Sequence, residues 1–346
     1  MLLERMTHEG FEKVVFCTDP DSGLRAIVAI HSTVLGPAGG GVRMYPYASE
    51  EEALNDVMRL ARGMTYKNAA AGLALGGGKS VIIGDPTSES KEKIIRAMGR
   101  KIQSLRGEYL AGFDIGTTLN DMEILLEETD FVLTRPQRIG GGGDVSGGTA
   151  LGVVEAMRAA IEHEGFEDFN NLKVAVQGLG AVGAKVAQML VERGATVIAT
   201  DVRPQMAEFA SSIGAKWVDA EDILSQDVDV FCPCARGGII DDFAIATLKA
   251  RIVVGAANNI LLEPSHGPAL DARGITYVPD FIANAGGIIC DADSRQEGGF
   301  NLERAEQSVR GIYGRVHECL KRAKATGTTA QDVAHAMAEE RLTKHP

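Results

Sequence analysis

The sequence feature that most restricts the fold is a short β-branched run followed at once by regularly spaced glycines. Residues 173–177 have the sequence KVAVQ and are followed by Gly178, Gly180 and Gly183. A helical pattern comes next, and then a second apolar run that ends at Asp201, 18 positions beyond the last glycine (201 − 183). A lone G-x-G-x-x-G is weak evidence. Between a strand and a helix, with a later acidic residue, it is typical of a dinucleotide-binding unit.

Each part of this pattern has a physical role in holding a dinucleotide. Gly178 makes the turn, Gly180 lets the pyrophosphate approach the backbone, and Gly183 allows close packing of helix on strand. The free N–H groups at the helix start bind the phosphates. Asp201 would accept hydrogen bonds from the ribose hydroxyls and repel a 2′-phosphate, which favours NAD over NADP, although Arg203 would soften that repulsion. The other expected cofactor contacts here are Leu179, Ala181, Val182 and Val202. The alternative is a strand–helix–strand unit that binds no nucleotide.

Size and charge limit the class of protein. The 346 residues suggest about two domains, and 45% hydrophobic with 24% charged residues is ordinary for a globular protein. A net charge of −12 argues against a nucleic-acid or anionic-membrane partner. No apolar run approaches the roughly 20 residues that span a bilayer, and the first residues lack a signal-peptide pattern.

The cysteines give no sign of a metal site. All five are scattered, and Cys232 and Cys234 have no second Cys or His pair at a zinc-binding distance. We therefore expect a reduced cytoplasmic protein without a structural metal, in which these two cysteines have a structural role.

The second half of the chain alternates regularly between strand-like and helix-like segments. This alternation predicts a parallel sheet with right-handed crossovers, that is, a Rossmann-type α/β domain. The expected strands are 173–177, 196–200, 227–231, 252–256 and 275–278. After Asn301 the pattern is helical to the end of the chain, with a last helix from about Ala330 to Leu342.

The first half predicts a separate α/β domain. Strands are expected at 11–17, 24–31, 80–84 and 108–113, helices at 49–62, 88–105 and 118–126, and a glycine loop at 35–43. The glycine-rich stretch 139–148 is predicted to be a hinge. We therefore expect a substrate domain at 1–138, completed by a C-terminal helix at about 326–346, and a nucleotide domain at 139–325.

Two lysines in the first half stand in unusually small and apolar surroundings. Lys67 is followed by Asn and a run of Ala, Gly and Leu, and Gly76, Gly77 and Gly78 directly precede Lys79. Such residues make a poor solvated face, and the glycines would let a ligand approach the backbone. The alternative is a glycine loop beside a strand with both lysines in water.

Several stretches occur together in a recognisable order. They are 36–44, 67–79, 114–118, 178–183, 233–235, 255–259 and 284–287. Together they resemble the amino acid dehydrogenases of the glutamate/leucine/phenylalanine/valine family, most closely the shorter leucine, valine and phenylalanine enzymes. The resemblance covers the chain from about residue 10 to 342. It implies reversible oxidative deamination of an L-amino acid to a 2-oxo acid and ammonia, with NAD as hydride acceptor.

The resemblance also implies roles for individual residues. Lys67 matches the lysine that binds the substrate carboxylate, together with main-chain groups of Gly40 and Gly41. Lys79 matches the catalytic lysine that activates water, and we expect the charge of Lys67 and of the nicotinamide ring to lower its pKa. Asp114 matches the carboxylate that binds the amino group and carries its proton. The alternative for Asp114 is a turn-capping aspartate.

Further positions match the family around the nicotinamide. Asn258 and Asn284 match residues beside its ribose and the reacting centre, and Thr149 matches a threonine near its carboxamide. The main chain is expected to pass the cofactor at Cys234, Ala235 and Ala257. The alternative for the asparagines and the threonine is that they are ordinary residues of strand ends and turns.

Departures from the family pattern bear on the substrate side chain. Gly39 and Gly112 replace larger residues of relatives and would enlarge the pocket, which favours an aromatic substrate such as phenylalanine. Ile288 is bulkier and β-branched, which argues against an enlarged pocket. Leu73, Ala74 and Ile288 are apolar, so we expect a branched-chain or phenylalanine substrate.

Two other functions remain open at this stage. A glutamate dehydrogenase of the same fold would need a basic residue in the side-chain pocket. A non-catalytic NAD-binding sensor would be expected to lack Lys67, Lys79 or Asp114. The resemblance also implies a homo-oligomer, either an octamer or a dimer.

Overall fold

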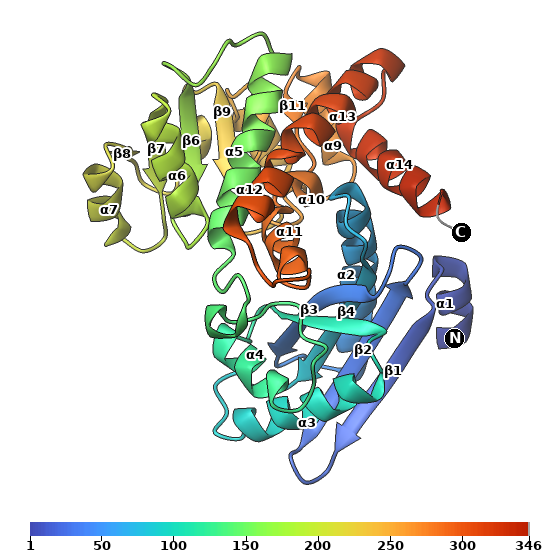
Figure 1. Cartoon of the computed structure of the whole chain (residues 1–346). Helices are drawn as coiled ribbons and strands as arrows, with labels where there is room; N and C mark the ends of the chain where they lie inside the picture. The colour runs from blue at the N-terminus through green and yellow to red at the C-terminus, as the bar shows by residue number, and fades with distance from the viewer. Residues whose placement is uncertain (345–346) are drawn as a thin grey trace. The chain divides into compact units, whose positions relative to one another are not determined.

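The computed structural model describes residues 1–344, and residues 345 and 346 of the expected C-terminal helix lie outside this part. The chain forms two compact units (Figure 1). Unit 1 comprises Met1–Asp144, Cys290–Leu302 and Ala338–Pro346, and unit 2 comprises Val145–Ile289 and Glu303–Met337. This division differs from the expected one, because residues 139–144 and 290–302 lie in unit 1 and residues 326–337 lie in unit 2.

Unit 1 is built on a five-stranded mixed sheet in the order β1-β2-β4-β3-β5. β2 is antiparallel to both of its neighbours, β1 and β4. β3 is parallel to both of its neighbours, β4 and β5. The strands are β1 Lys13–Asp19, β2 Leu24–Ser32, β3 Ala38–Tyr45, β4 Gly76–Ile83 and β5 Tyr109–Phe113. The helices near them are α1 Leu2–Glu9, α2 Glu50–Ala70, α3 Lys91–Ser104 and α4 Leu119–Leu126, with a 3₁₀ turn η1 at Gln137–Ile139.

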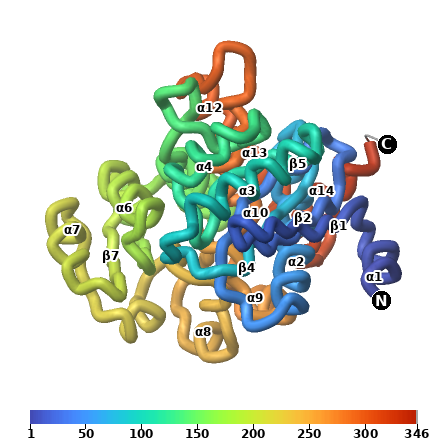
Figure 2. Tube along the Cα trace, turned by 90° about the horizontal axis from the view of Figure 1, so that it is seen from below, coloured from blue at the N-terminus to red at the C-terminus, as the bar shows by residue number. Residues whose placement is uncertain are grey.

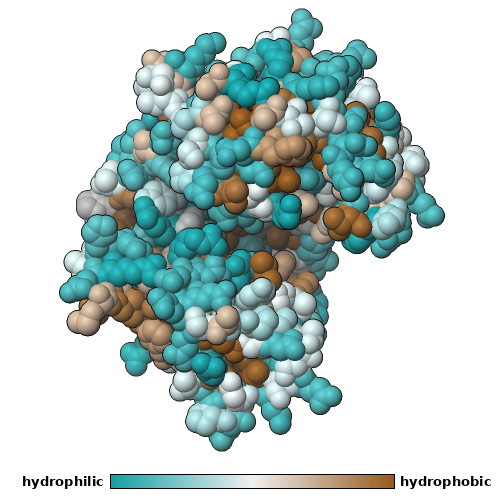
Figure 3. Space-filling view, turned by 180° about the vertical axis from the view of Figure 1, so that it is seen from behind, coloured by the Kyte–Doolittle hydropathy of each residue, from teal (hydrophilic) through white to brown (hydrophobic). Residues whose placement is uncertain are grey.

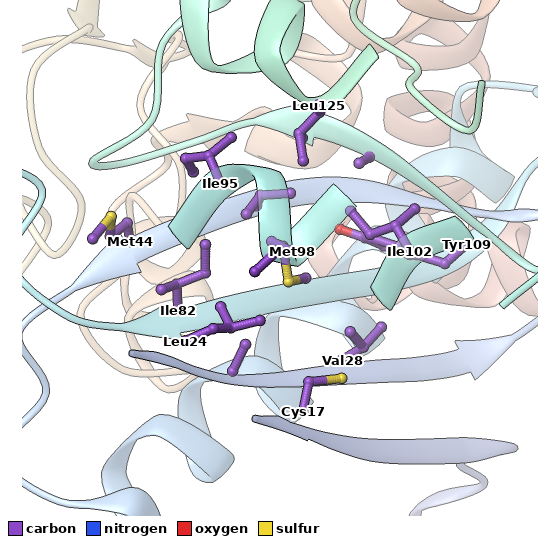
Figure 4. Packing of buried hydrophobic residues seen from close by; sticks show 14 of the residues in the cluster. Cys17, Leu24, Val28, Met44, Ile82, Ile95, Met98, Ile102, Tyr109 and Leu125 are labelled. Carbon is purple, nitrogen blue, oxygen red and sulfur yellow. The ribbon is translucent and has the colours of Figure 1, made fainter. Parts of the chain in front are cut away.

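Helices cover the two faces of this sheet unequally. α2 packs Val57 and Ala61 against Ile27 and Val81 on one face. α3 and α4 cover the opposite face, where their apolar side chains surround Tyr109 (Figure 4). Because α2 begins with Ser49 as N-cap and continues through Gly63 to Ala70, it is longer than the expected helix 49–62. It therefore carries Lys67 in its last turn.

The glycine-rich segments of unit 1 are strands, which corrects the expected loop at 35–43. That stretch contributes to β3, and the three glycines before Lys79 begin β4. A Cβ on Gly77 would lie 2.0 Å from Thr65 Oγ1 of α2, and one on Gly78 would lie 2.9 Å from the Tyr109 ring. These glycines therefore allow close packing of protein against protein, whereas we had expected them to admit a ligand.

The segment expected to be a hinge is largely tied to unit 1. The backbone N–H of Gly142 donates to Ser294 Oγ at 3.0 Å, and the N–H of Phe300 donates to the carbonyl of Gly140 at 2.8 Å. The next helix, α5 Ser146–His163, starts in unit 2.

Unit 2 contains a six-stranded parallel sheet in the order β11-β10-β9-β6-β7-β8, which confirms the expected Rossmann-type architecture. The strands are β6 Lys173–Gln177, β7 Thr196–Thr200, β8 Lys216–Trp217, β9 Val230–Pro233, β10 Ile252–Val253 and β11 Thr276–Tyr277. β8 was not expected. Figures 1 and 2 show α6 Gly183–Glu192 and α7 Met206–Ser212 beside β7.

The remaining helices of the described residues lie between the later strands of this sheet and in the C-terminal region after β11. They are η2 Ile223–Ser225, α8 Asp242–Thr247, α9 His266–Ala272, α10 Asp280–Ala283, α11 Gly286–Asp293, α12 Leu302–Arg310, α13 Ile312–Thr326 and α14 Ala330–Thr343. Polar side chains dominate the molecular face in Figure 3, where apolar ones form only separate patches. Among residues 1–344, no helix has the length and apolar character needed to cross a bilayer.

The close approach of α2 to β4 makes Gly77 irreplaceable. We expect Gly77→Ala to lower the free energy of unfolding by about 3 kcal/mol or more, because the added methyl group meets the backbone of Thr65. Gly63→Ala in the same helix is the matched control. It meets nothing within 4 Å and should stabilise by up to about 1 kcal/mol. Urea unfolding measures both, and equal midpoints for Gly77→Ala and the wild type would contradict the packing argument.

Candidate active site

Three neighbouring strands of unit 1 place a lysine and two glycines side by side. Gly41 of β3 pairs with Gly112 of β5, and the pairing of Val42 with Ser80 puts Gly41 next to Lys79 of β4. A Cβ on Gly41 would lie 3.0 Å from Lys79 Nζ and 2.8 Å from the Cβ of Asp114. The bare backbone at Gly41 therefore makes room for both functional side chains.

Lys79 and Asp114 form a buried ion pair. Lys79 Nζ lies 2.8 Å from Asp114 Oδ2, and Lys79 is only 5% exposed. Burial lowers the pKa of the Lys79 ammonium, and Asp114 partly opposes this. Burial is thus the largest cause, whereas the sequence had suggested the charge of Lys67. Burial alone would raise the pKa of Asp114, but Lys79 and Arg43 outweigh it and bring that pKa down to about 2.

A second cation, missed in the sequence, contacts the same carboxylate. Arg43 Nε donates to Asp114 Oδ2 at 2.8 Å, and its Nη1 donates to Asp56 Oδ2 of α2 at 2.8 Å. The hydroxyl of Tyr47 donates to the same Asp56 oxygen at 2.6 Å. Alternate residues of a strand share one face, so Arg43 lies on the same face of β3 as Gly39 and Gly41. If this stretch had been predicted as a strand, its spacing would have placed Arg43 beside the site.

Three other predicted substrate residues of unit 1 lie on β3 or in the last turn of α2. The carbonyl of Gly40 accepts a hydrogen bond from the Tyr109 hydroxyl at 2.8 Å. Gly39 faces an apolar wall, since its Cβ would lie 3.3 Å from Leu75 Cδ1. Lys67 lies in the last turn of α2, directly before Asn68, whose amide donates to the carbonyl of Gly76 at 2.6 Å and so fixes the helix end to β4.

A further buried carboxyl group lies in unit 1 and was also missed. Thr134 Oγ1 donates to Asp291 Oδ2 of α11 at 2.8 Å. The other oxygen, Oδ1, is buried and has no hydrogen-bond partner among the described residues. Burial raises the pKa of Asp291 to about 7, against a smaller lowering by Thr134. The signal in the sequence is an acidic residue directly after Ile288, Ile289 and Cys290 in an otherwise apolar helical turn.

The glycine motif of unit 2 has the geometry of a phosphate-binding turn. Gly178 has φ of +94°, and a Cβ on Gly183 would lie 1.9 Å from the carbonyl oxygen of Gly178. A Cβ on Gly180 would meet nothing within 4 Å, so the backbone there is open to a ligand. Ala181 follows, and Val182 is the N-cap of α6, whose free N–H groups favour an anion. These residues fit the pyrophosphate of a dinucleotide.

Asp201 follows β7 next to this turn. Its Oδ2 accepts a hydrogen bond from the N–H of Leu179 at 2.7 Å, and its Oδ1 accepts one from Arg203 Nε at 2.8 Å. The hydrogen bonds from Arg203 are the largest cause that lowers the pKa of Asp201 to about 2. The carboxylate is therefore ionised, and it lies beside the exposed Val202.

The loops after β9 and β10 meet the same end of the sheet. The N–H of Cys234 donates to the carbonyl of Gln177 at 2.7 Å, and a Cβ on Gly178 would lie 2.7 Å from that of Ala235. The two sulfurs of Cys232 and Cys234 are 3.6 Å apart.

Unit 2 also brings together the asparagines and the threonine expected near the nicotinamide. Asn284 Nδ2 donates to Asn258 Oδ1 at 2.9 Å and to the carbonyl of Ala257 at 3.3 Å. Thr149 lies in the first turn of α5, and a Cβ on Gly287 would lie 2.7 Å from its Oγ1. Ile288 follows in α11. These residues belong to unit 2, whereas Lys67, Lys79 and Asp114 belong to unit 1.

The chain matches known proteins over nearly its whole length. Residues 11–131 match the family model described as Glu/Leu/Phe/Val dehydrogenase, dimerisation domain. Residues 140–203 and 200–345 match that described as Glutamate/Leucine/Phenylalanine/Valine dehydrogenase. The chain is 47% identical over 343 residues to leucine dehydrogenase of Bacillus subtilis, covering 99% of this chain and 94% of the relative. It is 46% identical over 348 residues to phenylalanine dehydrogenase of Bacillus thermotolerans, covering 99% and 90%.

Solved structures give the same result. The crystal structure of L-tryptophan dehydrogenase from Nostoc punctiforme matches with a TM-score of 0.87 and 37% identity, covering 100% of this chain and 99% of that one. Hetero-hexameric glutamate dehydrogenase from Thermus thermophilus matches with a TM-score of 0.81 at 24% identity, covering 99% and 94%, which shows a shared fold.

The raised pKa of Asp291 has a consequence for stability. Its carboxyl stays protonated in the folded state up to about pH 7 but ionises near its ordinary value in the unfolded state. The free energy of unfolding should therefore fall as the pH rises from about 4 to 7, by at most about 4 kcal/mol. Asp291→Asn should remove this decline and be more stable than the wild type at pH 8.

Urea unfolding at pH 5 and pH 8 measures the effect. Asp121→Asn is the control, because this buried carboxylate has Lys91 Nζ at 2.8 Å and its loss should destabilise the protein at both pH values. An equal pH dependence of the wild type and Asp291→Asn would show that Asp291 is ionised throughout.

Proposed function

Since the chain belongs to the Glu/Leu/Phe/Val dehydrogenase family of amino acid oxidoreductases, we propose that it oxidises an L-amino acid to its 2-oxo acid and ammonia, with NAD as the hydride acceptor. The reverse amination follows from the same chemistry. The observation that carries this proposal is the buried Lys79–Asp114 pair beside the bare backbone of Gly41. Burying a charged pair costs desolvation free energy that the mutual attraction offsets only in part, and titratable groups perturbed in this way cluster at functional sites.

The residues of unit 1 would bind the substrate and move its protons. Lys67, with main-chain groups of Gly40 and Gly41, binds the carboxylate. Asp114 binds the amino group and exchanges a proton with it. After oxidation to the imine, Lys79 takes a proton from the water that adds to the imine carbon, and ammonia leaves. Burial supports this role, because it favours the neutral amine of Lys79.

The residues of unit 2 would hold NAD, which when bound accepts the hydride released from the substrate Cα. The turn from Gly178 to Gly183 suits the pyrophosphate, and Asp201 suits the ribose hydroxyls. Arg203, bound to Asp201, lies where it could also meet a 2′-phosphate, so we propose a preference for NAD and not its exclusive use. Asn284 and Asn258, already hydrogen-bonded to each other, would contact the nicotinamide side with Thr149.

The substrate side chain is proposed to be branched-chain or aromatic. Leucine and phenylalanine are the substrates that name the two bacterial relatives, and tryptophan names the enzyme of the similar solved structure. Gly39 and Gly112 favour a large side chain. The family model for residues 11–131 describes a dimerisation domain, which supports a homo-oligomer.

Replacing Lys79 tests the proposal directly. Lys79→Ala should lower NADH formation from the best substrate among a panel of L-amino acids by about 10²- to 10⁴-fold, because the general base is lost. Lys93→Ala, an exposed lysine of α3, is the matched control and should keep full activity. Absorbance at 340 nm with NAD or NADP measures both the activity and the cofactor preference. Binding of NAD without oxidation of any amino acid would instead support the sensor alternative.

Arg43 should control the pH dependence of the reaction. Its charge lowers the pKa of Asp114 and, among smaller contributions, that of Lys79. Arg43→Gln should therefore raise both, so that the rise of kcat/KM with pH occurs at higher pH than in the wild type. Arg59→Gln is the control, since Arg59 contacts the other oxygen of Asp56 and is 56% exposed. An unchanged profile in Arg43→Gln would contradict the coupling.

A further inference from the structure

Asp291 and Thr134 form a buried polar pair that the proposed catalysis does not use. Thr134 Oγ1 donates to Asp291 Oδ2 at 2.8 Å, and the second carboxyl oxygen is buried without a hydrogen-bond partner among residues 1–344. A buried polar atom without a partner costs about 1–3 kcal/mol. Native proteins rarely retain such an atom unless something binds it. We therefore infer that a ligand binds at this pair.

The pair borders the space that the substrate side chain is proposed to occupy. Gly112 of β5 pairs with Gly41 of β3, so the two glycines share one face of the sheet, and a Cβ on Gly41 would lie 2.8 Å from the Cβ of Asp114, which directly follows β5. A Cβ on Gly112 would lie 3.0 Å from Thr134 Oγ1. The threonine hydroxyl thus lies directly against the surface that Gly112 leaves bare, on the side of the strand that carries Asp114.

The neighbouring walls are mainly apolar, although a Cβ on Gly39 would also lie 3.6 Å from the side-chain nitrogen of Asn68. A Cβ on Gly39 would lie 3.3 Å from Leu75 Cδ1 and 3.5 Å from Leu133 Cδ2. Leu133 directly precedes Thr134, so one short segment supplies both an apolar wall and the polar pair. The surface around Gly39 and Gly112 in unit 1 is therefore mainly apolar, and the Thr134–Asp291 pair supplies a hydrogen-bond acceptor at one point of it.

We propose that Asp291, held by Thr134, sets the side-chain specificity of this enzyme by accepting a hydrogen bond at Oδ1 from a donor group on a large substrate side chain. This inference rests on the proposed amino acid dehydrogenase function. The substrate class is an L-amino acid whose side chain carries an N–H or O–H group, such as an indole, a phenol or a terminal ammonium.

Branched-chain and aromatic side chains without such a donor remain substrates, but we expect them to be oxidised less efficiently because they leave this contact unmade. Leucine or phenylalanine would leave the Asp291 oxygen desolvated and unpaired, and glutamate would place a carboxylate beside a carboxyl group. A site built to pair with a polar substrate group rejects the analogue that lacks it far more strongly than an apolar pocket rejects an extra methylene. The expected preference at pH 8 or above, where the Asp291 carboxyl is ionised, is about 10- to 100-fold, as for a hydrogen bond to a charged group.

The test compares matched substrate pairs that differ in the donor. They are tyrosine with phenylalanine, tryptophan with 3-benzothienylalanine, and lysine with norleucine. In the wild type, kcat/KM should favour the donor member of at least one pair by 10-fold or more. Which pair responds distinguishes a neutral donor from an ammonium. In Asp291→Val, the preference should fall below threefold, while the donor-free member is oxidised at least as well as by the wild type.

Thr134→Val should weaken the preference in part, since it leaves Asp291 in place but unanchored. Thr129→Val is the matched control, because this buried threonine donates to Gln103 Oε1 at 2.8 Å within the same unit and should leave the preference intact. Equal or better oxidation of the donor-free member in every pair would overturn the inference and leave the dehydrogenase function standing. Oxidation of no amino acid at all would overturn both.

Discussion

An ammonium group that is 5% exposed needs a compensating charge, and Asp114 provides it for Lys79 through a 2.8 Å contact. Arg43 contacts the same carboxylate oxygen and is itself balanced by Asp56 of α2. Cation and anion therefore alternate from β4 through β3 to α2. Removal of one member leaves its neighbour buried and unpaired, which is the costly case for interior charges. Lys79 is thus fixed in place by the sheet and by a helix at the same time.

Glycines make room for this row of alternating charges within a closely packed sheet, and they allow close packing on both of its faces. Gly41 leaves room for Lys79 and Asp114, and Gly77 lets α2 approach β4. On the opposite face, Gly78 admits the ring of Tyr109, whose hydroxyl donates to the carbonyl of Gly40. The same residue type therefore serves the site on one side and the core on the other, and the local sequence does not distinguish these uses.

The predictability of each part follows from how local its causes are. The nucleotide unit was predictable because its strand, its turn glycines and Asp201 follow one another closely in the chain. β3 was predicted as a loop, since glycine is a poor strand former and the packing that holds it extended comes from distant elements. α2 was predicted too short because Gly63 interrupts its pattern. The contact between Thr134 and Asp291 joins positions 157 residues apart, and no local pattern reports such a pair. The positions of Lys79 and Asp114 were found, whereas their roles came from resemblance.

The chain passes from one unit to the other after Asp144, Ile289, Leu302 and Met337. A protease that cut the chain at the glycine-rich segment 139–148 would not produce two complete folding units. The N-terminal fragment would lack the stretch 290–302, and with it Asp291 and the Ser294 hydroxyl that receives the N–H of Gly142. To express either unit alone, distant parts of the gene would have to be joined. Recombination that exchanged unit 1 between relatives would likewise have to transfer its N-terminal and C-terminal stretches together.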